Sequence, residues 1–312
     1  AFGPLGRENK VELDFFSREA RPRLDCVNAH AILSDLPSEA LCEVVPSRGN
    51  VRLFVEGPAI SLVRMAQSLT PYLKRGALTP QAALVRVTAL ASELCGTYSR
   101  DPDDPAEGQI NWGATPLCDT AELRRVANAL TGMKELRLAR RAAGYAAPCS
   151  GSPTETLLAL AMTLPPEMGG VAFPAFKQNE QVEWPAGAGS LLHHNTMRPD
   201  FFWPRHRVAI EYNGKVHDDE ENAEEDHFRR QDYATCGISV LEARASDVCD
   251  AASLERFLRL VALKLAACEG PGFVAEVEKR LLAEGARGGR ATLISQVLAL
   301  GKRASASAEA GA

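Results

Sequence analysis

The stretch 197–217, MRPDFFWPRHRVAIEYNGKVH, contains two runs of strand-forming residues, which predict strands at 195–202 and 207–212 joined by a turn at 203–206. Asp200 and Glu211 stand inside these otherwise apolar runs. Charged side chains are rarely buried unless they are paired or bound to a metal ion. The two carboxylates therefore make this hairpin the first candidate site in the chain.

Side chains alternate across a strand, so the run VAIEYN at 208–213 has two different faces. One face carries the Val, Ile and Tyr side chains and can pack under a helix, whereas Glu211 and Asn213 point to the other side. Strand pairing can bring Asp200 within about 5 Å of Glu211. Two carboxylates this close raise each other's pKa unless a cation lies between them. Because Mg²⁺ is held by one or two carboxylates, waters and a substrate phosphate, the pattern predicts a Mg²⁺ or Mn²⁺ site.

The 312 residues are enough for two domains or one large domain. The formal net charge is −5, so the chain lacks the overall basic character typical of a dedicated binder of double-stranded DNA. Any contact with nucleic acid must come from a local patch. No apolar run approaches the ~20 residues that span a bilayer, and the first residues, AFGPLGRENK, show no export signal. We therefore expect a cytoplasmic protein that does not bind membranes.

The cysteines are scattered and form no C-x-x-C pair, which argues against a zinc site. A chain of this length can bury its own core without disulfides, so we expect free thiols that are mostly buried. Their positions are 26, 42, 95, 118, 149, 236, 249 and 268.

Apolar periodicity and capping residues predict a largely helical first half and an alternating second half. Thr79, Asp119 and Ser152 are the expected N-caps, and the Pro-, Asp- and Gly-rich segment 99–118 is expected to be a loop. Helices are predicted at 59–69, 79–95, 119–130, 134–148, 152–164, 222–236, 254–267, 272–284 and 291–301, and further strands at 51–55 and 238–243. The order after residue 152 is typical of an α/β layer with a mixed sheet.

Pro199-Asp200, ten residues and then Glu211-Tyr212-Asn213 resemble the core motif of the PD-(D/E)XK nucleases. The wider pattern resembles a bacterial domain-of-unknown-function family that is similar to the very-short-patch repair endonucleases. Upstream, FVEGPAISLVRMAQSL and ASELCGTY look like the type IV abortive-infection antitoxin-like segments that precede this domain in some members. The motifs are SP-x-E at 152–155, PDFFWP at 199–204, AIEYNGKVH at 209–217, D-x-x-R at 226–229, and Gly237 before a strand.

The resemblance extends over roughly 50–250 and implies a domain organisation. It implies an antitoxin-like, mainly helical region at 1–150 and a restriction-endonuclease-like domain at 151–268, with a mixed sheet flanked by helices. C-terminal helices at 269–302 and a disordered tail at 303–312 would follow.

The resemblance also implies roles for individual residues. Asp200 and Glu211 would hold the metal, helped by the carbonyl of Tyr212. Glu155 would be the carboxylate of the first core helix, and His217 would assist proton transfer. Asn213 departs from the family pattern, because a nuclease of this fold usually has Lys there; Lys215, two residues on, is an alternative.

Structural explanations stand beside these roles. Glu155 lies three residues after Ser152, which is the spacing of a capping box. Asp200 could pair with a neighbouring Arg, and His217 could end a strand. Asp226 and Arg229 lie one helical turn apart and could form a surface ion pair; Arg229 and the adjacent Arg230 could instead contact nucleic acid.

These patterns lead to three hypotheses of function. The first is a metal-dependent DNA endonuclease, acting in repair or phage defence. The second is a catalytically inactive nuclease fold that binds DNA as a regulator, which Asn213 favours. The third is an antitoxin that binds and neutralises a protein toxin. The sequence leaves the oligomeric state open.

Overall fold

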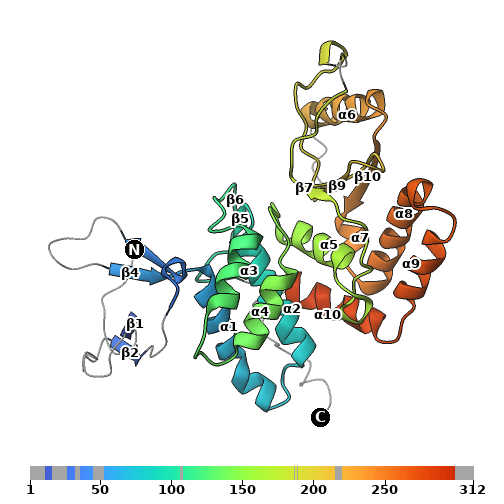
Figure 1. The fold of residues 1–312 in the computed structure, drawn as a ribbon. Helices are drawn as coiled ribbons and strands as arrows, with labels where there is room; N and C mark the ends of the chain where they lie inside the picture. Colours follow the sequence, from blue (N-terminus) through green and yellow to red (C-terminus); the bar gives the residue numbers. More distant parts are fainter. Residues whose placement is uncertain are drawn as a thin grey trace.

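The computed structural model describes residues 11–15, 27–31, 36–44, 53–105, 108–185, 187, 189–214 and 220–298 (Figure 1). Predictions that fall outside this part of the chain concern Lys215, His217, Cys26, the tail at 303–312 and the ends of two predicted elements, at 51–52 and 299–301.

The first half of the described chain contains four helices and short strand pairs. β1 (Val11–Phe15) pairs in parallel with β2 (Val27–Ala31), and β3 (Leu41–Val44) pairs antiparallel with β4 (Leu53–Glu56) after the short helix η1 (Ser38–Ala40). A small hairpin, β5 (Tyr98–Ser99) with β6 (Asn111–Trp112), lies in the predicted loop. The helices are α1 (Pro58–Lys74), α2 (Pro80–Leu94), α3 (Thr120–Ala129) and α4 (Leu136–Tyr145).

The second half is α/β in order, as predicted. Its helices are α5 (Pro153–Thr163), α6 (Glu220–Thr235), α7 (Ala245–Val248), α8 (Ala251–Glu269), α9 (Phe273–Leu281) and α10 (Ala286–Leu298). Its strands are β7 (Lys177–Gln178), β8 (Phe201–Trp203), β9 (Val208–Asn213) and β10 (Ser239–Arg244), with short helices η2 (Pro166–Met168) and η3 (Gly189–Leu191) between α5 and β8. The described chain is thus a mixed α/β protein.

The strands of the second half form one mixed sheet in the order β10-β9-β8-β7. β10 runs parallel to β9, whereas β8 is antiparallel to both β9 and β7. Phe201 on β8 pairs with Ile210 on β9. Asp200 precedes Phe201 and Glu211 follows Ile210, so both carboxylates lie next to this antiparallel pair. The hairpin predicted from the sequence is confirmed, but its first strand, β8, is shorter than the expected 195–202. Met197, in the predicted part that precedes β8, forms an isolated bridge to Val182.

The alternation predicted for β9 is also confirmed. Val208 and Ile210 belong to the main hydrophobic core, together with residues of α5 and α8. Ala209, between them, belongs to a second, smaller core beneath α6. The sheet therefore has one face on the main core and one face on α6, and Glu211 shares the side of α6.

Helix starts follow the predicted caps. The side chains of Thr79, Asp119 and Ser152 accept hydrogen bonds from backbone N–H groups at 3.1, 2.7 and 3.0 Å, three residues on in each case. These bonds satisfy donors that a helix start leaves unpaired. The starts of α2, α3 and α5 are thus encoded locally.

One hydrophobic core contains buried residues from Ala40 at one end of the sequence to Val297 at the other. It therefore includes residues on both sides of the predicted domain boundary at residue 150. Figure 1 shows α5 and α10 lying between the helices of the first half and the sheet of the second. The approach of α10 to η2 is close, because a Cβ on Gly169 would meet the backbone of Gly289 and Arg290 at 2.5 Å. The last described helix thus packs into the middle of the molecule.

The cysteine prediction is right in one respect and wrong in another. All seven described cysteines are free thiols, but only Cys95 and Cys236 are buried. Most of the others are exposed: Cys42 lies in the two-stranded pair β3–β4, and Cys149, Cys249 and Cys268 lie in a loop or at helix ends. In the described part of the chain, no helix has both the length and the apolar character needed to cross a membrane.

A substitution in β9 tests the role of the hairpin in the main core. Ile210 is completely buried, so Ile210→Ala should lower the free energy of unfolding by about 2–5 kcal/mol. Urea titration followed by circular dichroism measures the change. Leu263→Ala, at a position that is 59% exposed, is the control and should stay within about 0.5 kcal/mol of the wild type. Equal effects of the two substitutions would contradict the assignment.

Candidate active site

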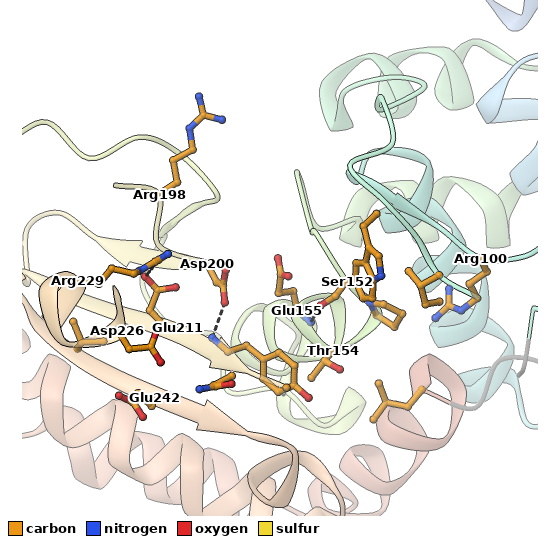
Figure 2. Close-up of a pocket in the computed structure, with 18 of the residues that line it drawn as sticks. Arg100, Ser152, Thr154, Glu155, Arg198, Asp200, Glu211, Asp226, Arg229 and Glu242 are labelled. Atoms are coloured by element: carbon orange, nitrogen blue, oxygen red, sulfur yellow. Dashed lines mark hydrogen bonds and ion pairs between the residues drawn. The ribbon is translucent and has the colours of Figure 1, made fainter. Parts of the chain in front are cut away.

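A cavity of about 1000 Å³ lies where the hairpin β8–β9, the start of α5 and the segment between α2 and α3 meet (Figure 2). Figure 2 shows Glu155, Asp200 and Glu211 next to one another, with Arg100 on the far side of Ser152. Other charged lining residues are Arg198, Asp226, Arg229, Arg230 and Glu242. The cavity therefore collects the three acidic residues that the sequence singled out.

Asp200 precedes β8, and its Oδ2 accepts a hydrogen bond of 2.6 Å from the backbone N–H of Tyr212 on β9. Burial, followed by the charges of Glu155 and Glu211, raises the pKa of Asp200 to about 8. The Tyr212 hydrogen bond and the positive charge of Arg229 oppose this rise but do not cancel it. Asp200 is therefore a carboxyl group that is costly to ionise in the absence of another cation.

Glu211 is held from the opposite side by α6. Its Oε1 accepts hydrogen bonds from the Arg229 guanidinium at 2.9 Å and from the Tyr233 hydroxyl at 2.5 Å. Tyr233 is 1% exposed, and burial followed by the Glu211 charge raises the pKa of its hydroxyl. Arg229 and Tyr233 are one helical turn apart, so α6 presents both donors on the same face. Glu211 is thereby held in place by two donors from α6.

Glu155 lies in the first turn of α5 and is 8% exposed. Its Oε2 accepts hydrogen bonds from the Gly151 N–H and the Asn179 side chain, both at 2.7 Å. Ser152 in turn accepts from the Glu155 N–H at 3.0 Å. Only half of the capping box forms: Ser152 caps the helix, but the Glu155 carboxylate accepts from the Gly151 N–H and Asn179 and not from the Ser152 N–H, and it also lines the cavity.

The positive charges around the cavity are mostly committed to acidic partners. Arg229 pairs with Glu211 and Arg230 pairs with Glu242 at 3.0 Å, so the ion pair expected between Asp226 and Arg229 is not the one that forms. Arg229 reaches across to the strand, where the partly buried Glu211 also accepts from Tyr233. Arg198 is exposed and has no ion-pair partner within the described residues.

The remaining predicted residues divide in two groups. Asn213, the last residue of β9, and Tyr212 both line the cavity. Lys215 and His217 belong to the segment that the structure does not describe, so their predicted roles remain predictions.

Asp200 and Glu211 are the carboxylates of the cavity that could hold a divalent cation. In the described ranges, no group of three or more His, Cys, Asp or Glu side chains is arranged to hold a metal ion. Asp200 and Glu211 form a smaller set, which matches the one or two carboxylates that Mg²⁺ usually takes. Only Oδ2 of Asp200 and Oε1 of Glu211 accept hydrogen bonds from described residues, which leaves one oxygen on each. Together with the raised pKa of Asp200, this donor set fits a hard cation.

Several residues of the site region were missed by the sequence analysis. Asp232 accepts hydrogen bonds from the backbone N–H groups of His193 and His194 at 3.0 and 2.9 Å, which ties the loop before the hairpin to α6. Burial opposes ionisation of Asp232, but these bonds and those of the imidazoles hold its pKa below the usual range. The helical spacing of Asp226, Arg229 and Tyr233 was a usable signal for Tyr233. Asp232 offered none, since its partners are distant in sequence.

Comparison of the chain with known protein families, with curated proteins and with solved structures gives no match.

Replacement of Asp200 by Asn tests the electrostatics of the carboxylate cluster. The folded-state pKa of about 8 exceeds the unfolded value of about 3.9, so the folded protein binds more protons between these limits. The stabilising contribution of neutral Asp200 is complete below about pH 4 and is lost as the pH rises through about 8. Asp200→Asn should therefore flatten the fall of stability with pH, by at most about 1.4 kcal/mol per pH unit.

Urea titrations of wild type and Asp200→Asn at pH values from about 5 to 8, without divalent cations, measure this difference. Curves that run parallel over this range would show that Asp200 is ionised throughout.

Replacement of Tyr233 by Phe tests how Glu211 is held. The change removes the hydroxyl that donates to Glu211 and should cost about 1.5–3 kcal/mol, the range for a hydrogen bond to a charged group. Tyr72→Phe, at a half-exposed ring on α1, is the matched control and should be near neutral. Thermal unfolding of both variants at constant pH measures their stability. A Tyr233→Phe protein as stable as the control would refute the hydrogen bond from Tyr233 to Glu211.

Proposed function

We propose that the protein is a Mg²⁺-dependent nuclease that hydrolyses phosphodiester bonds of DNA. The observation that carries the proposal is the convergence of Glu155, Asp200 and Glu211 in one cavity, with a donor set that fits a divalent cation. We further propose that the sheet β10-β9-β8-β7 with α5 and α6 is a restriction-endonuclease-like core. The mixed sheet and the motif residues at the β8–β9 hairpin support this assignment.

Asp200 and Glu211, helped by the Tyr212 carbonyl, would hold the metal. When bound, Mg²⁺ supplies charge stabilisation for the phosphate oxygens and lowers the pKa of water. The chain's own residues then have separate tasks. Arg229 and Tyr233 hold Oε1 of Glu211 and leave its second oxygen without a hydrogen bond from the described residues, and the Tyr212 N–H does the same for Asp200. The side chains are thus preorganised, which is what charge stabilisation in a site requires.

Arg198 and Asn213 provide contacts to the substrate. Arg198 is exposed and without an ion-pair partner in the described part of the chain, so its guanidinium can bind a phosphate in a two-point contact. Asn213 lines the cavity and can accept or donate a hydrogen bond to a water, although it lacks the positive charge of Lys. Catalysis by this site would therefore depend on the cation more than in a nuclease with Lys at this position.

A second function is favoured by one specific contact. The Arg229 guanidinium already neutralises Glu211 at 2.9 Å, so the site holds together without a metal. Combined with Asn213, this contact supports a non-catalytic nuclease fold that binds nucleic acid. The two functions differ in whether a divalent cation binds and whether phosphodiester bonds break.

Metal titration by calorimetry, followed by cleavage assays on single-stranded and duplex DNA, tests the proposal. Asp200→Asn and Glu211→Gln should each reduce cleavage by at least about 100-fold, since even outer partners of a metal ligand are worth about 10–100-fold. Glu276→Gln on α9, outside the cavity, is the control for contaminating nucleases and should cleave like the wild type. Absence of cleavage by the wild type, or cleavage that survives in both carboxylate variants, would reject the nuclease, and absence of metal binding as well would favour the binding function.

A further inference from the structure

The wall of the cavity opposite the carboxylates comes from the first half of the chain. It includes Arg100, Ile110 and Trp112, all within or beside the β5–β6 hairpin. Trp112 is 63% exposed, whereas Trp203 is completely buried and Trp184 is partly covered, with its indole N–H donating to the Asn195 carbonyl. An indole that lies open to solvent gives up the large gain of burying an aromatic ring. Trp112 thus adds nothing to the core and faces the cavity instead.

The hairpin that carries Trp112 is firmly attached to the helix that carries Glu155. Tyr98, which pairs with Trp112, is 1% exposed, and its hydroxyl lies 3.0 Å from the Thr156 hydroxyl on α5. The N–H of Thr97 donates to the Ser150 carbonyl at 2.8 Å. Thr156 follows Glu155 directly in the sequence. The position of the indole relative to the carboxylates is therefore set by hydrogen bonds.

Arg100 also holds the β5–β6 hairpin in place. Its guanidinium forms an ion pair with Glu93 at the end of α2 and donates to the Val297 carbonyl of α10 at 2.8 Å. Because this guanidinium is committed, it is not available for a substrate phosphate. On the side of Trp112, the lining groups that are left to contact a ligand are therefore mainly apolar and aromatic. On the side of Asp200, they are anionic.

We propose that Trp112 stacks on an unpaired base of a nucleic-acid substrate whose phosphate lies at the carboxylates; this inference rests on the proposed binding of nucleic acid. A ring face can stack only on a base whose own face is open. Inside a duplex both faces of a base are covered, so the partner is a single-stranded or extruded nucleotide. A cavity of about 1000 Å³ has room for one. The substrate class is therefore DNA or RNA with unpaired nucleotides beside the phosphate.

Intrinsic fluorescence tests the stacking. The probe is a single-stranded oligodeoxynucleotide of about 12 nucleotides, compared with the same sequence as a duplex. Ca²⁺ replaces Mg²⁺, and the strand is checked for integrity on a gel. We expect the single strand to quench the wild-type emission, and Trp112→Ala to lose the quenching and bind roughly 5- to 150-fold more weakly. Trp112→Phe should retain most of the affinity because it keeps a ring.

Leu117→Ala is the matched control, since Leu117 is 70% exposed in the same segment but does not line the cavity; it should bind like the wild type. Circular dichroism confirms that each variant is folded. Unchanged affinity of Trp112→Ala, or equal binding of the duplex, would overturn the stacking while leaving nucleic-acid binding in place. Failure of the wild type to bind either probe would overturn both. Stacking without cleavage would uphold this inference and reject the nuclease.

Discussion

Mutual repulsion of Glu155, Asp200 and Glu211 is the constraint around which the site is arranged. Each carboxylate is restrained by different donors: backbone and amide groups for Glu155, one backbone N–H for Asp200, and a guanidinium with a phenol for Glu211. Only Glu211 receives a full positive charge. Burial, followed by the charges of Glu155 and Glu211, therefore raises the pKa of Asp200. An added cation would relieve the whole cluster at once.

Much of the fold follows from local signals in the sequence. The caps at Thr79, Asp119 and Ser152 were readable because a cap acts on its own helix, within three residues. The opposition of Asp200 and Glu211 was readable because alternation and a short turn fix the hairpin register. The length of its first strand was not, since strand ends depend on which neighbour is available to pair.

Contacts between distant segments could not be predicted in the same way. The sequence offered Asp226 as the near partner of Arg229, but in the folded chain the guanidinium pairs with Glu211, which accepts from Tyr233 as well. Trp112 lay in a segment whose composition indicated only a loop. Its place opposite the carboxylates depends on the Tyr98–Thr156 contact, for which no periodic pattern exists. The motif residues were therefore found, and the surroundings that define their chemistry were not.

The position of α10 has a consequence for biosynthesis. This helix ends at Leu298, yet it packs among elements made much earlier, and its Val297 carbonyl holds Arg100 on the wall of the cavity. A nascent chain emerging from the ribosome can form α2 and α5 long before it contains α10. The cavity wall is completed only when the last described helix has been synthesised, so a nascent chain that ends shortly after β9 contains all three acidic residues without the finished pocket.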